Sequence, residues 1–178
     1  LLWDPCLDIV GNRLPNVFIR RNLEGGSESK GAGDELERVA TLAEGLDENE
    51  GVLIYPEGTR FTPEKRAKLL ERFAAKGQDE ALAFAESLRH TLPPRLGGAL
   101  ALLERNPEAD AVFCAHTGLE GSATVASMLQ GDLIGKTVHI KQWGVRAGDI
   151  PREPAARVHW LQEQWRKVDA FVAKGRQS

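Results

Sequence analysis

Residues 51–60 read GVLIYPEGTR, and this stretch decides the predicted fold. Four apolar residues, 52–55, stand between Gly51 and Pro56, which is the pattern of a short strand buried on both faces. Proline cannot donate a hydrogen bond to a sheet, so we expect the strand to end at Pro56. Ligands of α/β sheets bind at the carboxyl ends of strands, so the polar residues that follow are candidates for a binding site.

The turn after this expected strand carries three reactive side chains within four residues. Arg60 offers a planar guanidinium suited to phosphate, Thr59 adds a hydroxyl, and the Glu57 carboxylate can orient the arginine or accept a proton. Gly58 allows the backbone to come close to a ligand. The simpler alternative is a polar turn in which Glu57 and Arg60 pair only with each other.

Length and composition are those of one globular domain spanning residues 1–178, with 42% hydrophobic and 28% charged residues. The formal charge of −3 argues against general nucleic-acid binding. The charges are uneven: residues 24–50 hold nine acidic and two basic side chains, whereas residues 60–76 hold six basic and two acidic ones. The positive stretch suits an anionic substrate or a membrane surface, although a solvated helix face is the commoner reason for such a run.

Cysteine usage points to a reducing compartment and away from a metal site. Cys6 and Cys114 are the two cysteines, and neither has a C-x-x-C partner or companion metal ligands. No apolar run reaches the length of a membrane span. The chain begins at Leu1, and its single methionine is Met128. We therefore expect it to be a piece of a longer protein.

Apolar periodicity predicts strands alternating with helices along the chain. Strands are expected at 17–19, 52–55, 109–114 and 138–143, and helices at about 36–46, 62–77, 80–88, 99–104, 122–130 and 156–174. Thr62 and Pro63 form a good helix start, with a capping hydroxyl and a proline at the first helical position. The last helix has one apolar face, which we expect to pack on the core rather than on a membrane. This alternation predicts an α/β fold with a mixed, largely parallel sheet flanked by helices.

Two of the expected strands are followed by arginines. Arg21 comes shortly after residues 17–19, and Arg60 comes shortly after residues 52–55. If both strands belong to one sheet, the two guanidiniums reach the same crevice at its carboxyl edge. Two arginines that converge on one phosphate bind it far better than either does alone.

These segments resemble the glycerolipid acyltransferase family typified by 1-acylglycerol-3-phosphate acyltransferase. Residues 55–60 match the family's F-P-E-G-T-R block with tyrosine for phenylalanine, and Phe61 stands where serine is usual. Residues 18–21 match the upstream F-I-x-R block, with Pro15 in place of the expected glycine. Residues 92–95, LPPR, with the glycine pair at 97–98, resemble a segment found downstream in some branches. The resemblance covers roughly residues 1–120 and rests on two blocks in the correct order.

The resemblance implies a transfer of a fatty acyl group to a hydroxyl of a glycerol-phosphate lipid, with lysophosphatidic acid as the default acceptor. The acyl donor would be a thioester of coenzyme A or of acyl carrier protein, used as a co-substrate, with no bound cofactor or metal. The residues implied to hold the acceptor phosphate are Arg21, Glu57, Gly58, Thr59 and Arg60. Two further candidates come from their own positions in the sequence: Arg95 either joins this cluster or caps a helix end, and His116 either lines the crevice or is a structural or merely polar histidine. The lipid substrate and the family imply work at a membrane surface, on its cytoplasmic side, by peripheral association or through an anchor outside this chain.

One family block is missing from the sequence. The chemical step of the family uses H-x-x-x-x-D, in which histidine is the general base and aspartate orients its ring. The residues five positions after the four histidines, His90, His116, His139 and His159, are Arg95, Gly121, Gly144 and Gln164. We therefore expect the block to lie before Leu1, and the chain alone to be inactive.

Two alternatives to a truncated acyltransferase follow from this departure. The first is a pseudoenzyme that kept a lipid-phosphate cleft and lost its base. The second is an unrelated α/β phosphoester-binding protein in which residues 56–60 match the family by coincidence. The second alternative would require Arg21 and Arg60 to lie on different sides of the fold.

Overall fold

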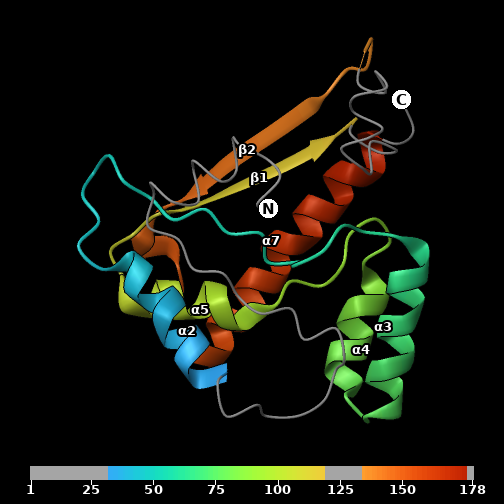
Figure 1. Cartoon of the computed structure of the whole chain (residues 1–178), viewed down its shortest axis with the longest axis horizontal. Coiled ribbons are helices and arrows are strands. Elements are labelled where there is room, and N and C mark those ends of the chain that lie inside the picture. Colours follow the sequence, from blue (N-terminus) through green and yellow to red (C-terminus); the bar gives the residue numbers. More distant parts are fainter. Residues whose placement is uncertain (1–31, 119–133, 176–178) are drawn as a thin grey trace, which may run out of the picture. The chain divides into compact units, whose positions relative to one another are not determined.

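The computed structural model describes residues 32–118 and 134–175 (Figure 1). These residues fall into two compact units, which we treat separately. The described part of the first unit comprises residues 32–54 and 96–107, and that of the second comprises residues 55–95, 108–118 and 134–175. The strand expected at 17–19 and the helix expected at 122–130 lie outside the described residues, as do Arg21 and Cys6.

The first unit is built from short helices. They are α2 (Ala32–Ala40), the 3-10 helix η1 (Thr41–Ala43) and α5 (Leu96–Arg105). Val39 and Ala43 are buried, as is Ala99 of α5. The Arg105 guanidinium binds the carboxylates of Glu37 and Glu44. The helix predicted at 36–46 is present in part, since α2 begins earlier, at Ala32, and the helical segment ends at Ala43. α2 and α5 pack against each other.

The second unit contains three helices and a short 3-10 helix among its described residues. They are α3 (Pro63–Ala75), α4 (Asp79–Ser87), the 3-10 helix η2 (Ala147–Asp149) and α7 (Pro154–Gly175). The Thr62 hydroxyl accepts a hydrogen bond from the Lys65 backbone N–H at 3.3 Å, and Pro63 is the first helical residue, which confirms the predicted start. Gly77 follows the end of α3 with a φ of +62°, a conformation that glycine adopts most easily.

The described strands form one antiparallel pair rather than a largely parallel sheet, so that part of the fold prediction is wrong for these residues. β1 (Ala111–Thr117) pairs with β2 (His139–Val145), with Phe113 opposite Trp143 and Thr117 opposite His139. The mixed helix and strand content of the prediction is confirmed. A continuous apolar run favours a strand buried on both faces in a parallel sheet, but β1 alternates in exposure, with Val112 70% and Ala115 2% exposed, as in an antiparallel pair covered on one face.

The expected strand at 52–55 is also corrected by the structure. The segment belongs to no ladder among the described strands, and its side chains alternate in exposure. Val52 and Ile54 are half-buried, whereas Leu53 is 76% exposed and Tyr55 is 79% exposed. Successive side chains of an extended chain point to opposite faces, so packing on one side covers only every second residue.

The core of the second unit lies between α7, α4 and β1. In Figure 1, α7 is drawn in red and runs beside β1, and the two elements are in contact. The central cluster consists of Phe84, Leu88, Ala115, Trp165, Val168 and Val172. The prediction that the last helix packs on the core through one apolar face is therefore confirmed. None of the helices described here is both long enough and apolar enough to cross a membrane.

Candidate functional site

The Pro56–Arg60 segment begins with a tight turn. The Tyr55 carbonyl accepts a hydrogen bond from the Gly58 N–H at 3.0 Å, which closes the turn over Pro56 and Glu57. Proline at the second position and glycine at the fourth are the residues that such a turn favours. Gly58 has a φ of +67°, so the left-handed conformation at this position suits glycine. The turn predicted at Pro56 is thus formed by the residues that predicted it.

The LPPR segment, residues 92–95, is bonded to this turn. Its two prolines lack an N–H, so the segment has two backbone donors. The Leu92 N–H donates to the Glu57 carboxylate at 3.1 Å, and the Arg95 N–H donates to the Pro56 carbonyl at 2.8 Å. Both donors of the segment therefore hold the turn.

Arg95 extends its side chain over the backbone of Gly58. A Cβ at Gly58 would lie 3.2 Å from both the Cζ and the Nε of Arg95. A Cβ at this position would require the guanidinium to shift by a few tenths of an ångström. Among the described residues, the Arg95 side chain has no hydrogen bond or ion pair, and the residue is exposed.

Two further positive groups belong to the same turn. The Lys65 Nζ donates to the Thr59 hydroxyl and to the Arg60 carbonyl, each at 2.9 Å. Arg60 is exposed and forms no ion pair with Glu57, so the simpler alternative of a Glu57–Arg60 pair is wrong. We call Arg60, Lys65 and Arg95 the cationic rim. Within the described part of the chain, no carboxylate neutralises any of its members.

Glu57 anchors the turn instead of projecting into solvent. Burial raises the pKa of its carboxyl from an ordinary 4.5 to about 7, the hydrogen bond from the Leu92 N–H opposes this rise, and the charge of Asp169 adds to it. Near neutral pH, Glu57 therefore carries only part of a negative charge beside the cationic rim.

Asp169 of α7 holds the residues that precede LPPR. Its carboxylate is buried and accepts the backbone N–H groups of Arg89, His90 and Thr91 at 3.2, 2.7 and 2.8 Å. The Thr91 hydroxyl also donates to it at 3.0 Å. One turn earlier in α7, the Trp165 Nε1 donates to the Leu92 carbonyl at 2.8 Å.

Sequence reasoning missed both of these α7 residues as parts of the site. In the sequence, Trp165 lies on the apolar face of the last helix and indicates only packing. A signal was present, since Asp169 is an acidic residue between the buried positions Val168 and Val172. A buried carboxylate requires hydrogen-bond donors, and that requirement could have flagged Asp169.

The other sequence candidates lie elsewhere or outside the description. Arg21 is not among the described residues. His116 is exposed on the face of β1 that points away from α7, opposite Ile140 of β2. The Nδ1 of His90 is enclosed and has no hydrogen-bond partner among the described residues.

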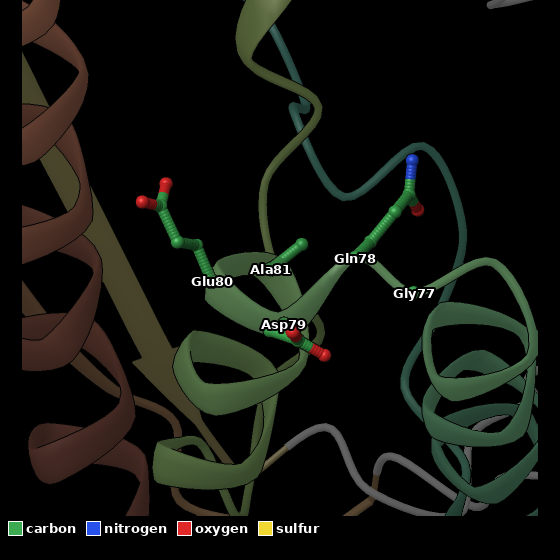
Figure 2. A pocket seen from close by; sticks show the side chains of 5 residues that line it. All are labelled: Gly77, Gln78, Asp79, Glu80 and Ala81. Atoms are coloured by element: carbon green, nitrogen blue, oxygen red, sulfur yellow. The ribbon is translucent and has the colours of Figure 1, made fainter.

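A hollow between α3 and α4 does not add a second site. It is lined by Gly77, Gln78, Asp79, Glu80 and Ala81, none of which was a candidate. Figure 2 shows that the side chains of Gln78, Asp79 and Glu80 point in different directions rather than toward one point. In the described ranges, no group of histidine, cysteine and acidic residues could hold a metal ion.

Comparison of the chain with protein-family models, with curated proteins and with solved structures found no match. The geometry of the turn and the motif resemblance are therefore the two grounds for a function.

Proposed function

We propose that the cationic rim binds the phosphate of a glycerol-phosphate lipid, and that the chain is the acceptor-binding part of an O-acyltransferase. The observation that carries this proposal is the Arg95 guanidinium lying over Gly58, with Lys65 and Arg60 at the same turn. A bound anion would supply the negative charge that no carboxylate among the described residues gives these three side chains as an ion pair.

The chemistry of the rim suits phosphate. A guanidinium presents a planar fork of donors that matches two phosphate oxygens, and an ammonium adds a compact point charge. The raised pKa of Glu57, caused mainly by burial, reduces the negative charge that would oppose the ligand. The Leu92 N–H already occupies one oxygen of that carboxylate. Glu57 therefore stabilises the turn in this proposal, and the three cations of the rim contact the ligand.

The acyl-transfer reaction is inferred from the resemblance of residues 55–60 and 18–21. We infer that a fatty acyl group passes from acyl-CoA or acyl carrier protein to lysophosphatidic acid, giving phosphatidic acid. We assign no described histidine as the base, so the role of this chain is to hold the acceptor. Because that acceptor is a membrane lipid, the site would work at a membrane surface.

Binding of matched lipids tests the phosphate site. We expect the protein to bind micelles containing lysophosphatidic acid at least about tenfold more tightly than micelles containing monoacylglycerol of the same chain length. Arg60→Ala should abolish most of this preference. Arg152→Ala is the control, because Arg152 is exposed and pairs with Glu108 away from the rim. Equal affinity for the two lipids, or equal losses in the two variants, would contradict the proposal.

An acyl-transfer assay on the complete protein separates the enzyme from the alternative of a pseudoenzyme. Formation of phosphatidic acid from acyl-CoA and lysophosphatidic acid would support the acyltransferase. Phosphate-dependent lipid binding without any product would instead support a lipid-phosphate-binding module.

A further inference from the structure

Four successive backbone N–H groups, those of residues 89–92, donate to two carboxylates from distant parts of the chain. Asp169 of α7 takes the N–H groups of Arg89, His90 and Thr91. Glu57 takes the N–H of Leu92 at 3.1 Å. The two carboxylates thus share one short segment, which joins α7 to the Pro56–Gly58 turn.

The Asp169 carboxylate is buried, so water cannot readily replace the hydrogen bonds that it accepts. Consecutive N–H groups that point the same way form a cradle for an anion. Here the cradle is filled by a side chain of the same chain, which is only 8% exposed. Without the carboxylate, three backbone donors would lose their acceptor in a poorly hydrated place.

The segment transmits this restraint directly to the cationic rim. Leu92 is followed by Pro93 and Pro94, whose rings fix the backbone φ angles, and then by Arg95. The fixed φ angles of the two prolines leave fewer rotations through which a shift at 89–91 could be absorbed before Arg95. The Arg95 N–H is bonded to the Pro56 carbonyl, and its guanidinium lies over Gly58.

We propose that Asp169 is a positioning residue that holds Arg95 against the Pro56–Gly58 turn, and hence in place for an anionic ligand. The part that concerns the ligand rests on the proposed function. Asp169 has no contact with the rim itself, and its effect would pass through residues 89–95.

Asp169→Asn tests the positioning in the full chain. The variant keeps the shape of the side chain, but it removes the charge and one acceptor oxygen. By hydrogen exchange, we expect the N–H groups of Leu92 and Arg95 to exchange about tenfold faster than in the wild type, although neither is bonded to Asp169. Faster exchange confined to residues 89–91 would overturn the inference.

Val172→Ala is the matched control, because it weakens the same helix without touching residues 89–92. In Val172→Ala, the ratio of the Arg95 N–H exchange rate to the exchange rates of the β1 N–H groups should stay at its wild-type value. If Asp169→Asn fails to fold, Thr91→Val removes one donor to Asp169 and should speed the exchange of Arg95 about threefold. An unchanged rate in Thr91→Val would count against the inference.

Affinity for glycerol 3-phosphate distinguishes failure of this inference from failure of the proposed function. A wild-type protein that does not bind this probe refutes the phosphate site, while the exchange rate of Arg95 still decides the role of Asp169. A wild-type protein that binds it, with unchanged affinity in folded Asp169→Asn, refutes the positioning role. We expect binding that is about tenfold weaker in Asp169→Asn and unchanged in Val172→Ala.

Discussion

The Arg95 guanidinium covers Gly58 so closely that a Cβ at this glycine would lie 3.2 Å from both Cζ and Nε. Gly58 therefore has two independent reasons to be glycine. Its φ of +67° disfavours any side chain, and the space beside its Cα is taken by Arg95. The first reason affects the stability of the fold, and the second affects the position of the Arg95 guanidinium.

Gly58→Ala and Gly77→Ala separate these two reasons. Gly77 has a similar φ of +62°, but nothing lies within 4 Å of its Cβ position. Both variants should lose about 1 kcal/mol of unfolding free energy in urea, from the backbone conformation. Only Gly58→Ala should lose affinity for glycerol 3-phosphate, because only there is Arg95 displaced. Equal affinities in the two variants would argue against Arg95 as a ligand-binding group.

Glu57→Gln should change how stability depends on pH. The wild-type carboxyl keeps its proton to about pH 7 in the folded protein, compared with an ordinary pKa of 4.5. Between these values the folded state binds more protons than the unfolded state, so stability falls as pH rises, by about 3 kcal/mol at most. A glutamine at position 57 does not ionise, so it causes no such fall in stability with pH. Its side-chain oxygen can still accept the hydrogen bond from the Leu92 N–H. Chemical denaturation at several pH values should show this fall in the wild type and not in the variant.

The control for this experiment is Glu163→Gln on α7, where the carboxylate is half-buried and pairs with Arg166. It should retain the wild-type loss of stability between acidic and neutral pH. If Glu57→Gln also retains that loss, Glu57 is not the group responsible.

Trp165→Phe should destabilise the chain through one hydrogen bond. The phenyl ring keeps most of the apolar contact, but it leaves the Leu92 carbonyl without its donor at 2.8 Å. A buried acceptor without a partner costs about 1–3 kcal/mol. Trp160→Phe is the comparison, since the described contact of Trp160 is an edge-to-face one with Phe113. Urea unfolding should show the larger loss for Trp165→Phe, and equal losses would count against a role of the Leu92 bond.

Thr62→Ala tests the start of α3, on which Lys65 depends. The Thr62 hydroxyl accepts the Lys65 N–H, and loss of such a cap costs about 1 kcal/mol. Thr62→Ser keeps the hydroxyl and should restore most of the stability in thermal unfolding. A serine variant as unstable as the alanine variant would show that the cap is not the cause.

Features governed by local rules could be predicted from the sequence. The start of α3 follows from Thr62 and Pro63, and the packing of α7 follows from an apolar face at helical spacing. The turn after Tyr55 follows from Pro56 and Gly58. Each of these depends on residues within a few positions of one another, where spacing and side-chain type suffice.

Features that depend on distant neighbours could not be predicted in the same way. The apolar run 52–55 suggested burial on both faces, yet it has no ladder partner among the described strands and leaves Tyr55 exposed. The bonds from Asp169 join residues 78 to 80 positions apart in the chain. Such a carboxylate is recognisable as a buried charge, but its partners appear only in the fold.

The most direct test of the central claim is a double-mutant cycle on Arg60 and Arg95, with glycerol 3-phosphate affinity measured by calorimetry. If both guanidiniums bind one phosphate, each alanine variant loses most of the affinity, and the double variant loses less than the sum. We predict a coupling free energy of at least about 1 kcal/mol. Strictly additive losses, or wild-type affinity in either single variant, would contradict a shared phosphate at the Pro56–Arg60 turn.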